Sequence, residues 1–312
     1  MIGTHALIQE SVQFPRLGLV VIDEQHRFGV KQREALIRQG SPHVLNMTAT
    51  PIPRTLTMVA YGDHDLSVLN EMPPGRQVIE TKVMSPSQRH DMNLFIRHQV
   101  EQGDQVFVIC PLIEDSESME VKSVKAEFER LHLVFPSMRI GLMHGKLKPE
   151  EKEEVMRQFK DHALDILVST SVIEVGIDIP NATIMLIEGA DRFGLSQLHQ
   201  FRGRVGRGKK KSYCFLCTDS TSEAVFTRLK AMVDCHDGFR LAEIDLKLRG
   251  PGEVYGVRQS GMPDLKVANV MNGVLMVRVR KAAEHLIETS TMEKHPVLKR
   301  MLVNLRRKME RA

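Results

Sequence analysis

Tryptophan is absent from the 312 residues, and only three tyrosines and four cysteines are present. So few cysteines, with no secretory signal, exclude a disulfide-stabilised secreted domain, and we expect a reducing, cytoplasmic compartment. No stretch approaches the ~20 apolar residues of a membrane span, so we expect no membrane partner. The hydrophobic content of 42% and the charged content of 26% are those of an ordinary globular protein, long enough for two domains and a tail.

A phosphate-binding loop of the form G-x-x-x-x-G-K-[S/T] is also absent. The only Gly-Lys pairs, Gly145-Lys146 and Gly208-Lys209, are followed by leucine and lysine. Yet Asp23 and Glu24 come directly after the apolar run 17–22, which has the pattern of a buried strand. Two acids at such a strand end are where P-loop ATPases keep their Mg²⁺ ligand and the base that activates water. Half of an ATP site is thus predicted, without the half that cradles the phosphates.

A single C-x-x-C sequence, Cys214 to Cys217, lies in a stretch that reads as a strand. Positions three apart on a strand face opposite sides, so we expect these thiols to point away from each other. With no second pair nearby, the spacing argues against a zinc site.

Short apolar runs alternate with amphipathic helical stretches along most of the chain. This alternation predicts a mostly parallel sheet with helices on both faces. A break at Pro73-Pro74-Gly75 reads as a hinge. We therefore predict a truncated α/β lobe over residues 1–75, a complete α/β lobe over 76–219 and a helical C-terminal region over 220–312.

Positive charge is mild overall, at +4, but it is concentrated in two places. Residues 197–211 hold six bases and no acid, and residues 299–311 hold six bases and one acid. Such clusters suit a phosphate-rich partner, although charge alone favours the simpler interpretation of solvated faces.

Residues 197–208 form the most specific run. On a helix, Gln200, Arg204 and Arg207 fall at i, i+4 and i+7 and share one face, while Leu198, Phe201 and Val205 anchor another. Arginines presented in this way can stabilise charge that develops on a transferring phosphoryl group. The interleaved glycines argue against an ordinary surface helix, because each weakens one by about 1 kcal/mol.

Two further segments carry hydroxyls after predicted strands. Thr48 and Thr50, around an alanine and before a proline, make a connector that can hydrogen-bond between lobes. In residues 168–178, Thr170 can donate to a nucleic-acid phosphate, and Gly176 and Asp178 can approach a nucleotide and the lobe interface. Alone, the segment with Thr48 and Thr50 is better explained as a polar turn, and the spacing within residues 168–178 is weak evidence for a function.

Taken in order, these segments resemble the motifs of superfamily 2 helicases. Asp23-Glu24-Gln25-His26 resembles motif II, Thr48-Ala49-Thr50 motif III, residues 168–178 motif V and residues 197–208 motif VI. The longer strings 23–30 and 48–55 are similar to those of RecG, a branched-DNA translocase family, and of the transcription-repair coupling translocases. The C-terminal strings 245–252 and 259–261 favour the RecG family.

The resemblance implies two RecA-like P-loop NTPase lobes that clamp ATP and Mg²⁺ and drive movement on double-stranded, branched DNA such as stalled forks and Holliday junctions. Asp23 would coordinate Mg²⁺, Glu24 would be the general base, and His26 would link the nucleotide state to DNA. Arg204 and Arg207 would reach the γ-phosphate, and Gln200 would either contact the nucleotide or support these arginines. The family also has a coupling hairpin and loop, which implies coupling roles for Arg228, Arg249 and Gln259. It further suggests a monomer.

The departures from the family pattern are equally informative. The P-loop, the motifs before it and the fork-splitting wedge domain have no counterpart in these residues, so we expect a fragment that needs the missing N-terminal part of the same protein and has weak or no ATPase activity alone. Two alternatives stay open: a fragment of a transcription-repair coupling translocase, and a non-enzymatic DNA-binding module.

Overall fold

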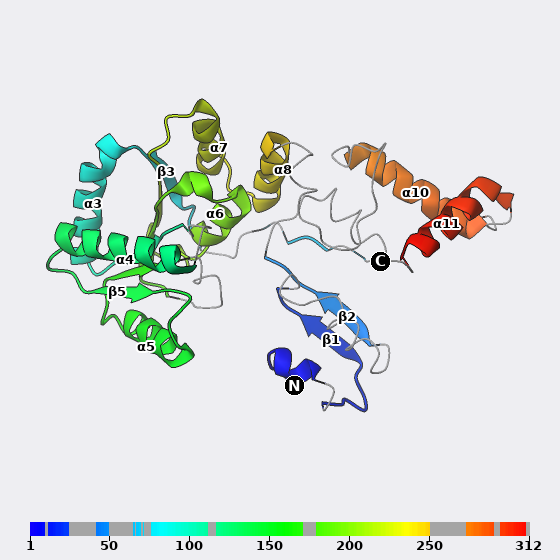
Figure 1. Cartoon of the computed structure of the whole chain (residues 1–312), viewed down its shortest axis with the longest axis horizontal. Coiled ribbons are helices and arrows are strands. Elements are labelled where there is room, and N and C mark those ends of the chain that lie inside the picture. The colour runs from blue at the N-terminus through cyan, green and yellow to red at the C-terminus, as the bar shows by residue number, and fades with distance from the viewer. Residues whose placement is uncertain are drawn as a thin grey trace. The chain divides into compact units, whose positions relative to one another are not determined.

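The computed structural model describes residues 1–9, 12–24, 42–49, 65, 67–69, 71, 76–111, 117–170, 179–249, 273–289 and 294–309 (Figure 1). By their contacts the residues form two compact units, Met1–Pro51 and Ile52–Ala312. The predicted hinge at residues 73–75 lies outside the described residues.

The first unit is built on two parallel strands. A short 3₁₀ helix, η1 (His5–Ile8), precedes β1 (Leu19–Ile22), which pairs in parallel with β2 (His43–Asn46). Val20 and Ile22 of β1 are buried, whereas Leu19 and Val21, which alternate with them along the strand, are exposed. The apolar run therefore forms the strand that its pattern predicts.

The second unit contains a sheet of six parallel strands in the order β3-β8-β7-β4-β6-β5. The central strands are buried at every position, as is typical of parallel sheets that are covered on both faces. The strands are β3 (Glu80–Met84), β4 (Gln105–Ile109), β5 (Ile140–Met143), β6 (Ile166–Ser169), β7 (Ala182–Ile187) and β8 (Tyr213–Cys217).

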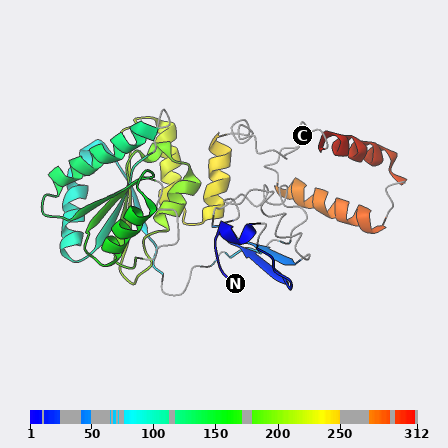
Figure 2. The ribbon, with the colours of Figure 1, turned by 60° about the horizontal axis from the view of Figure 1, so that its bottom comes forward.

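Helices cover both faces of this sheet, as Figure 2 shows from a second direction. Further helices follow the sheet along the chain. The elements are η3 (Pro86–Gln88), α3 (Arg89–Glu101), α4 (Glu117–Val134), α5 (Pro149–Lys160), η5 (Ala190–Arg192), α6 (Leu195–Arg202), α7 (Glu223–Asp234), α8 (Gly238–Arg249), α10 (Gly273–Thr289) and α11 (Pro296–Met309).

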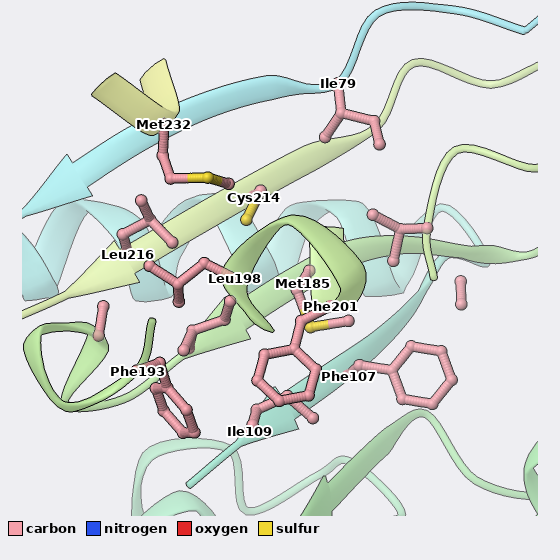
Figure 3. Close-up of a cluster of buried hydrophobic side chains, with 14 of the residues drawn as sticks. Ile79, Phe107, Ile109, Met185, Phe193, Leu198, Phe201, Cys214, Leu216 and Met232 are labelled. Atoms are coloured by element: carbon pink, nitrogen blue, oxygen red, sulfur yellow. The ribbon is translucent and has the colours of Figure 1, made fainter. Parts of the chain in front are cut away.

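Two apolar clusters hold the second unit together, one on each face of the sheet. Helices α3 and α4 supply one cluster, and α5 to α8 supply the other. In the latter, Leu198 and Phe201 of α6 lie against the sheet, as drawn in Figure 3. Strand β8 contributes side chains to both clusters, because Cys214 belongs to one cluster and Cys217 to the other. The prediction that these two thiols face opposite sides is confirmed.

The predicted class is confirmed: a parallel α/β sheet with helices on both faces and a helical C-terminal region. Two elements were not predicted, the edge strand β3 and the helix α3. Strand β3 reads Glu-Thr-Lys-Val-Met, which contains no continuous apolar run. Among the described residues, no helix is both long and apolar enough to cross a membrane.

Candidate functional site

The two acidic residues lie at the carboxyl edge of the two-stranded sheet. Asp23 and Glu24 follow β1 directly, and Thr48 comes two residues after β2. The strands are parallel, with Ile22 opposite Asn46, so both end at this edge. The structure therefore brings Asp23, Glu24 and Thr48 to one edge. His26 and Thr50 lie outside the described residues.

The backbone at Glu24 has an uncommon conformation, with φ = 50°. A non-glycine residue in this left-handed region costs about 1–2 kcal/mol, and such strain is found most often at functional sites. The Glu24 N–H donates to Oδ1 of Asp23 at 2.8 Å, which fixes the orientation of that carboxylate. Asp23 is exposed. An exposed carboxylate at a strand end fits Mg²⁺, which takes one or two protein carboxylates together with substrate phosphates and water.

The two predicted arginines lie on a loop, the arginine loop, which comprises residues 203–208. Helix α6 ends at Arg202, and Arg204 and Val205 still donate backbone hydrogen bonds to Phe201 and Arg202. Arg204 is half-buried and Arg207 is exposed. The loop thus begins as a continuation of the helix and then turns away from it.

The prediction that Gln200, Arg204 and Arg207 share one helix face is wrong. Gln200 is on α6, but the helix stops before either arginine. The helix has its C-cap at Gly203, and at Gly206 a φ of +73°, a conformation that L side chains rarely adopt, turns the chain further from the helix path. A Cβ at Gly206 would also lie 2.9 Å from Ile79 Cγ1, so the turn is closely packed.

The predicted anchoring face of this segment is confirmed. Leu198, Phe201 and Val205 are all buried in the same apolar cluster. The Phe201 ring meets that of Phe193 edge-to-face at 5.3 Å. Burial of these side chains holds α6 against the sheet and so places the start of the arginine loop.

Thr170 follows β6 directly and is fully buried. Its hydroxyl has no hydrogen-bond partner among the described residues. A buried hydroxyl without a partner costs about 1–3 kcal/mol and calls for a ligand, a water or a nearby group. Gly176 and Asp178, predicted to approach the nucleotide, lie outside the described residues.

At least three of the six bases in the run at residues 197–211 are paired within the protein. Lys210 Nζ lies 2.6 Å from Asp104 Oδ1, and Lys211 Nζ lies 2.6 Å from Glu80 Oε2. Arg202 is buried, with 3% of its surface exposed. These three bases therefore act in intramolecular pairing, and the run is not a uniformly solvated basic face.

Arg202 joins α6 to the end of α7. Its guanidinium donates to the carbonyl of Met232 at 2.7 Å, to that of Cys235 at 3.1 Å and to Nδ1 of His199 at 3.0 Å. The two carbonyls lie at the C-terminus of α7, where unpaired carbonyls favour a cation. A buried arginine thereby makes three hydrogen bonds that connect two helices.

Arg228 makes the reciprocal connection from α7. It donates to the carbonyl of Phe193 at 2.6 Å and to that of Asp191, both just before α6. Helix α6 also packs against α8. Arg228 was predicted to couple ATP turnover to translocation; the structure shows only that it links α7 to the residues before α6, and its coupling role stays a prediction. Arg249 is the last residue of α8, and its side chain, like all of Gln259, lies outside the described residues.

His199 is held neutral by its surroundings. Burial, assisted by the positive charge of Arg202, lowers the pKa of His199 to about 4. Because neutral imidazole can accept a hydrogen bond at Nδ1, it pairs with the Arg202 guanidinium. With its pKa lowered, His199 does not take up a proton near physiological pH, as an ordinary histidine would.

Sequence reasoning missed the roles of His199 and Arg202. Arg202 was counted only as one base of a cluster. One signal could have found it: Arg202 falls four residues after Leu198 and three before Val205, on the apolar side of α6. An arginine in an apolar stripe must either be paired or reach the surface.

A second network at the carboxyl edge of the six-stranded sheet was also not predicted. Glu188, just after β7, accepts from Arg89 at 2.7 Å and from Arg130 at 3.3 Å, and Arg130 also binds Glu127. These pairs attach α3 and α4 to the sheet end. Burial raises the pKa of Glu127, which opposes the lowering effect of Arg130.

Residues 90–209 match the family described as Helicase conserved C-terminal domain, and residues 235–311 match ATP-dependent DNA helicase RecG, domain 3, C-terminal. Curated relatives match almost the whole chain. The ATP-dependent DNA helicase RecG of Synechocystis is 53% identical over 97% of this chain and 37% of its own length. That of Bacillus subtilis is 48% identical over 95% of this chain and 44% of its own length.

Solved structures agree with this assignment. RecG bound to a three-way DNA junction has a TM-score of 0.69 and 44% identity, over 90% of this chain and 36% of that one. Yeast Dbp5 bound to RNA and ADP BeF3, 12% identical with a TM-score of 0.53, shows the likeness of the fold alone. The chain spans less than half the length of its curated relatives. It belongs to the RecG family of ATP-dependent DNA helicases and corresponds to the C-terminal part of these proteins.

Proposed function

We propose that this chain is the C-terminal motor portion of an ATP-dependent DNA translocase that remodels branched double-stranded DNA in recombination and repair. The observation that carries the proposal is the pair of arginine links between α6 and α7. Arg202 reaches from α6 to the end of α7, and Arg228 reaches from α7 to the residues just before α6. A change at the arginine loop is thereby passed to the hairpin of α7 and α8.

In this proposal the acidic edge and the arginine loop both act in ATP hydrolysis. Asp23 is assigned as the Mg²⁺ ligand and Glu24 as the base for the attacking water. Arg204 and Arg207 are assigned to the charge on the γ-phosphate, with Gln200 in support. Bound Mg²⁺ supplies charge neutralisation at the phosphates. An arginine that reaches a transferring phosphoryl group contributes about 10³–10⁵ in rate in related ATPases and GTPases.

The remaining predicted residues are assigned to coupling and to DNA. Arg228, Arg249 and Gln259 connect ATP turnover to movement, and His26, Thr48 and Thr50 connect the acidic edge to DNA. Thr170 is proposed to donate to a DNA phosphate. Because Thr170 is fully buried, this contact requires its hydroxyl to become exposed. Gly176 and Asp178 are proposed to line the nucleotide.

The partner proposed for this motor is branched DNA, in line with the relative that was solved on a three-way junction. Four buried free cysteines suit the reducing cytoplasm where such DNA is found. The phosphate cradle must come from a segment that carries a P-loop, since the 312 residues contain none.

ATP hydrolysis tests the proposal directly. The chain alone is expected to hydrolyse ATP weakly or not at all. A joined protein, in which the N-terminal part of the Synechocystis relative precedes this chain, is expected to hydrolyse ATP faster when branched DNA is added. Glu24→Gln should abolish this stimulation, whereas the exposed acid on α5 changed in Glu153→Gln should not. An inactive joined protein, or equal effects of the two changes, would contradict the proposal.

A non-enzymatic DNA-binding function is the second candidate. Helix α11 favours it, because its fourteen residues hold five bases and no acid, with Lys299 and Arg300 exposed. Duplex binding by the chain would then weaken steeply as salt rises and would not respond to ATP. Binding that is indifferent to salt would exclude this candidate.

A further inference from the structure

The segment at residues 76–80, which follows the predicted hinge, lies along the arginine loop. Arg76 Nη2 donates to the carbonyl of Gly203 at 3.0 Å, and Gln77 Nε2 donates to the carbonyl of Lys209 at 3.0 Å. Gly203 is the first residue of the arginine loop, and Lys209 directly follows its last residue. The segment therefore holds the loop at both ends.

Packing fixes the middle of the loop against the same segment. Ile79 is buried, and its Cγ1 lies where a side chain at Gly206 would begin. Beyond it, the Glu80 N–H donates to the carbonyl of Ser212 at 2.9 Å. The contacts with Gly203, Gly206 and Ser212 leave the segment little freedom to slide along the loop.

The Arg76 bond has the greatest consequence for the catalytic arginines. The carbonyl of Gly203 belongs to the peptide that joins it to Arg204, so a bond to this oxygen orients the backbone on which Arg204 stands. It also lies at the C-terminus of α6, where a positive charge is favourable. Arg76 is close enough to lower the pKa of His199, after burial and Arg202. Its charge therefore acts on the end of this helix.

We propose that Arg76 is a positioning residue of the motor, which holds the start of the arginine loop and so sets the reach of Arg204 and Arg207. The part of this inference that concerns ATP rests on the proposed function. The part that concerns the loop does not, because it follows from the contacts within the second unit. The two parts need separate measurements.

The first measurement is hydrogen exchange in the 312-residue chain. Arg76→Ala should raise amide exchange at residues 203–206 by about tenfold, which corresponds to the loss of about 1.4 kcal/mol of local stability. The matched control is Arg97→Ala, because Arg97 also donates to a backbone carbonyl, that of Val134 at 2.9 Å, far along the chain from the loop. This control should leave exchange at residues 203–206 unchanged. Equal exchange in the two variants would overturn the proposal.

The second measurement is ATP hydrolysis by the joined protein. Arg76→Ala should lower kcat about tenfold, with KM for ATP within about twofold, because a misplaced arginine weakens the transition state more than ground-state binding. Arg76→Lys keeps the charge and should recover part of kcat, and Arg97→Ala should not change it. A shift in KM alone, or an unchanged kcat, would sink the proposal.

The two measurements separate the possible failures. If the joined protein without substitutions is inactive, the proposed function fails, and hydrogen exchange alone decides whether Arg76 holds the arginine loop. If it is active and Arg76→Ala changes neither exchange nor kcat, the proposed function stands and the role of Arg76 is refuted.

Discussion

The two sheets of this protein differ in how much of their surface is covered. In the first unit, Leu19 and Val21 of β1 and Leu45 of β2 are 50–59% exposed. In the second unit, β4, β6 and β7 are buried at every position. The proposed acidic pair thus stands on a lightly packed sheet and the arginines on a fully packed one. Close packing therefore fixes the position of the arginines, whereas fewer buried side chains fix the position of the carboxylates.

The largest expected effect is a cavity in the well-packed unit. Phe201→Ala removes a ring that is 1% exposed and should destabilise the second unit by about 3–5 kcal/mol. Val20→Ala, in the small core of the first unit, should cost only about 1–2 kcal/mol. Urea unfolding with hydrogen exchange read separately in each unit measures both. Equal costs would remove the contrast between the sheets.

A smaller effect is expected from the arginine that links α6 and α7. Arg202→Ala leaves the carbonyls of Met232 and Cys235 and Nδ1 of His199 without this donor, and should cost about 2–4 kcal/mol. Thermal unfolding is the measurement. The exposed Arg97→Ala should cost less than about 1 kcal/mol, because water replaces its bond. A small loss for Arg202→Ala would show that the link contributes little to the packed unit.

The pH dependence of stability sharpens the comparison further. His199 has a pKa of about 4 in the folded protein and about 6.5 when unfolded, so below pH 6.5 the unfolded chain binds the proton more readily. The second unit should therefore lose up to about 3 kcal/mol as pH falls from 6.5 to 4. Denaturant unfolding at several pH values should show a flatter dependence for His199→Gln. Parallel curves for the two proteins would contradict this role.

The smallest effect is expected on the exposed face of the first unit. Val21→Thr keeps the β-branched shape of a half-exposed side chain and should change stability by less than about 0.5 kcal/mol. The same change at Val108, 1% exposed on β4, should cost about 1–3 kcal/mol because a hydroxyl is buried there. Unfolding of the two variants side by side measures the difference. A large cost at Val21 would show that this face is covered in solution.

Strand and helix alternation was enough to predict the class of fold, because apolar runs such as 106–110 are buried on both sides and leave a clear pattern. Strand β3 was not predicted because it is an edge strand whose charged residues Glu80 and Lys82 interrupt the apolar pattern. The extent of α6 was overestimated because helical spacing continued past Arg202. The conformation of Gly206, set by its packing on Ile79, decides where the turn lies.

The site was only partly predictable for a different reason. Motif order predicts Asp23, Glu24, Arg204 and Arg207 as site residues, but the contacts that hold the loop join residues far apart in the chain. Arg76 and Gly203 are 127 positions apart, and Arg202 and Met232 are 30 apart. Such contacts depend on the order of strands in the sheet, which no local pattern specifies.

The two cysteines of strand β8 can report, through their reactivity, on the opening of each face of the sheet. Burial raises the pKa of Cys214 to about 12 and also raises that of Cys217, so neither thiol reacts readily while the sheet is closed. Because the two face opposite clusters, a thiol reagent that modifies Cys214 before Cys217 would reveal that the face carrying α6 and α7 opens first. The rates of labelling at two atoms three residues apart would therefore time the opening of each face separately.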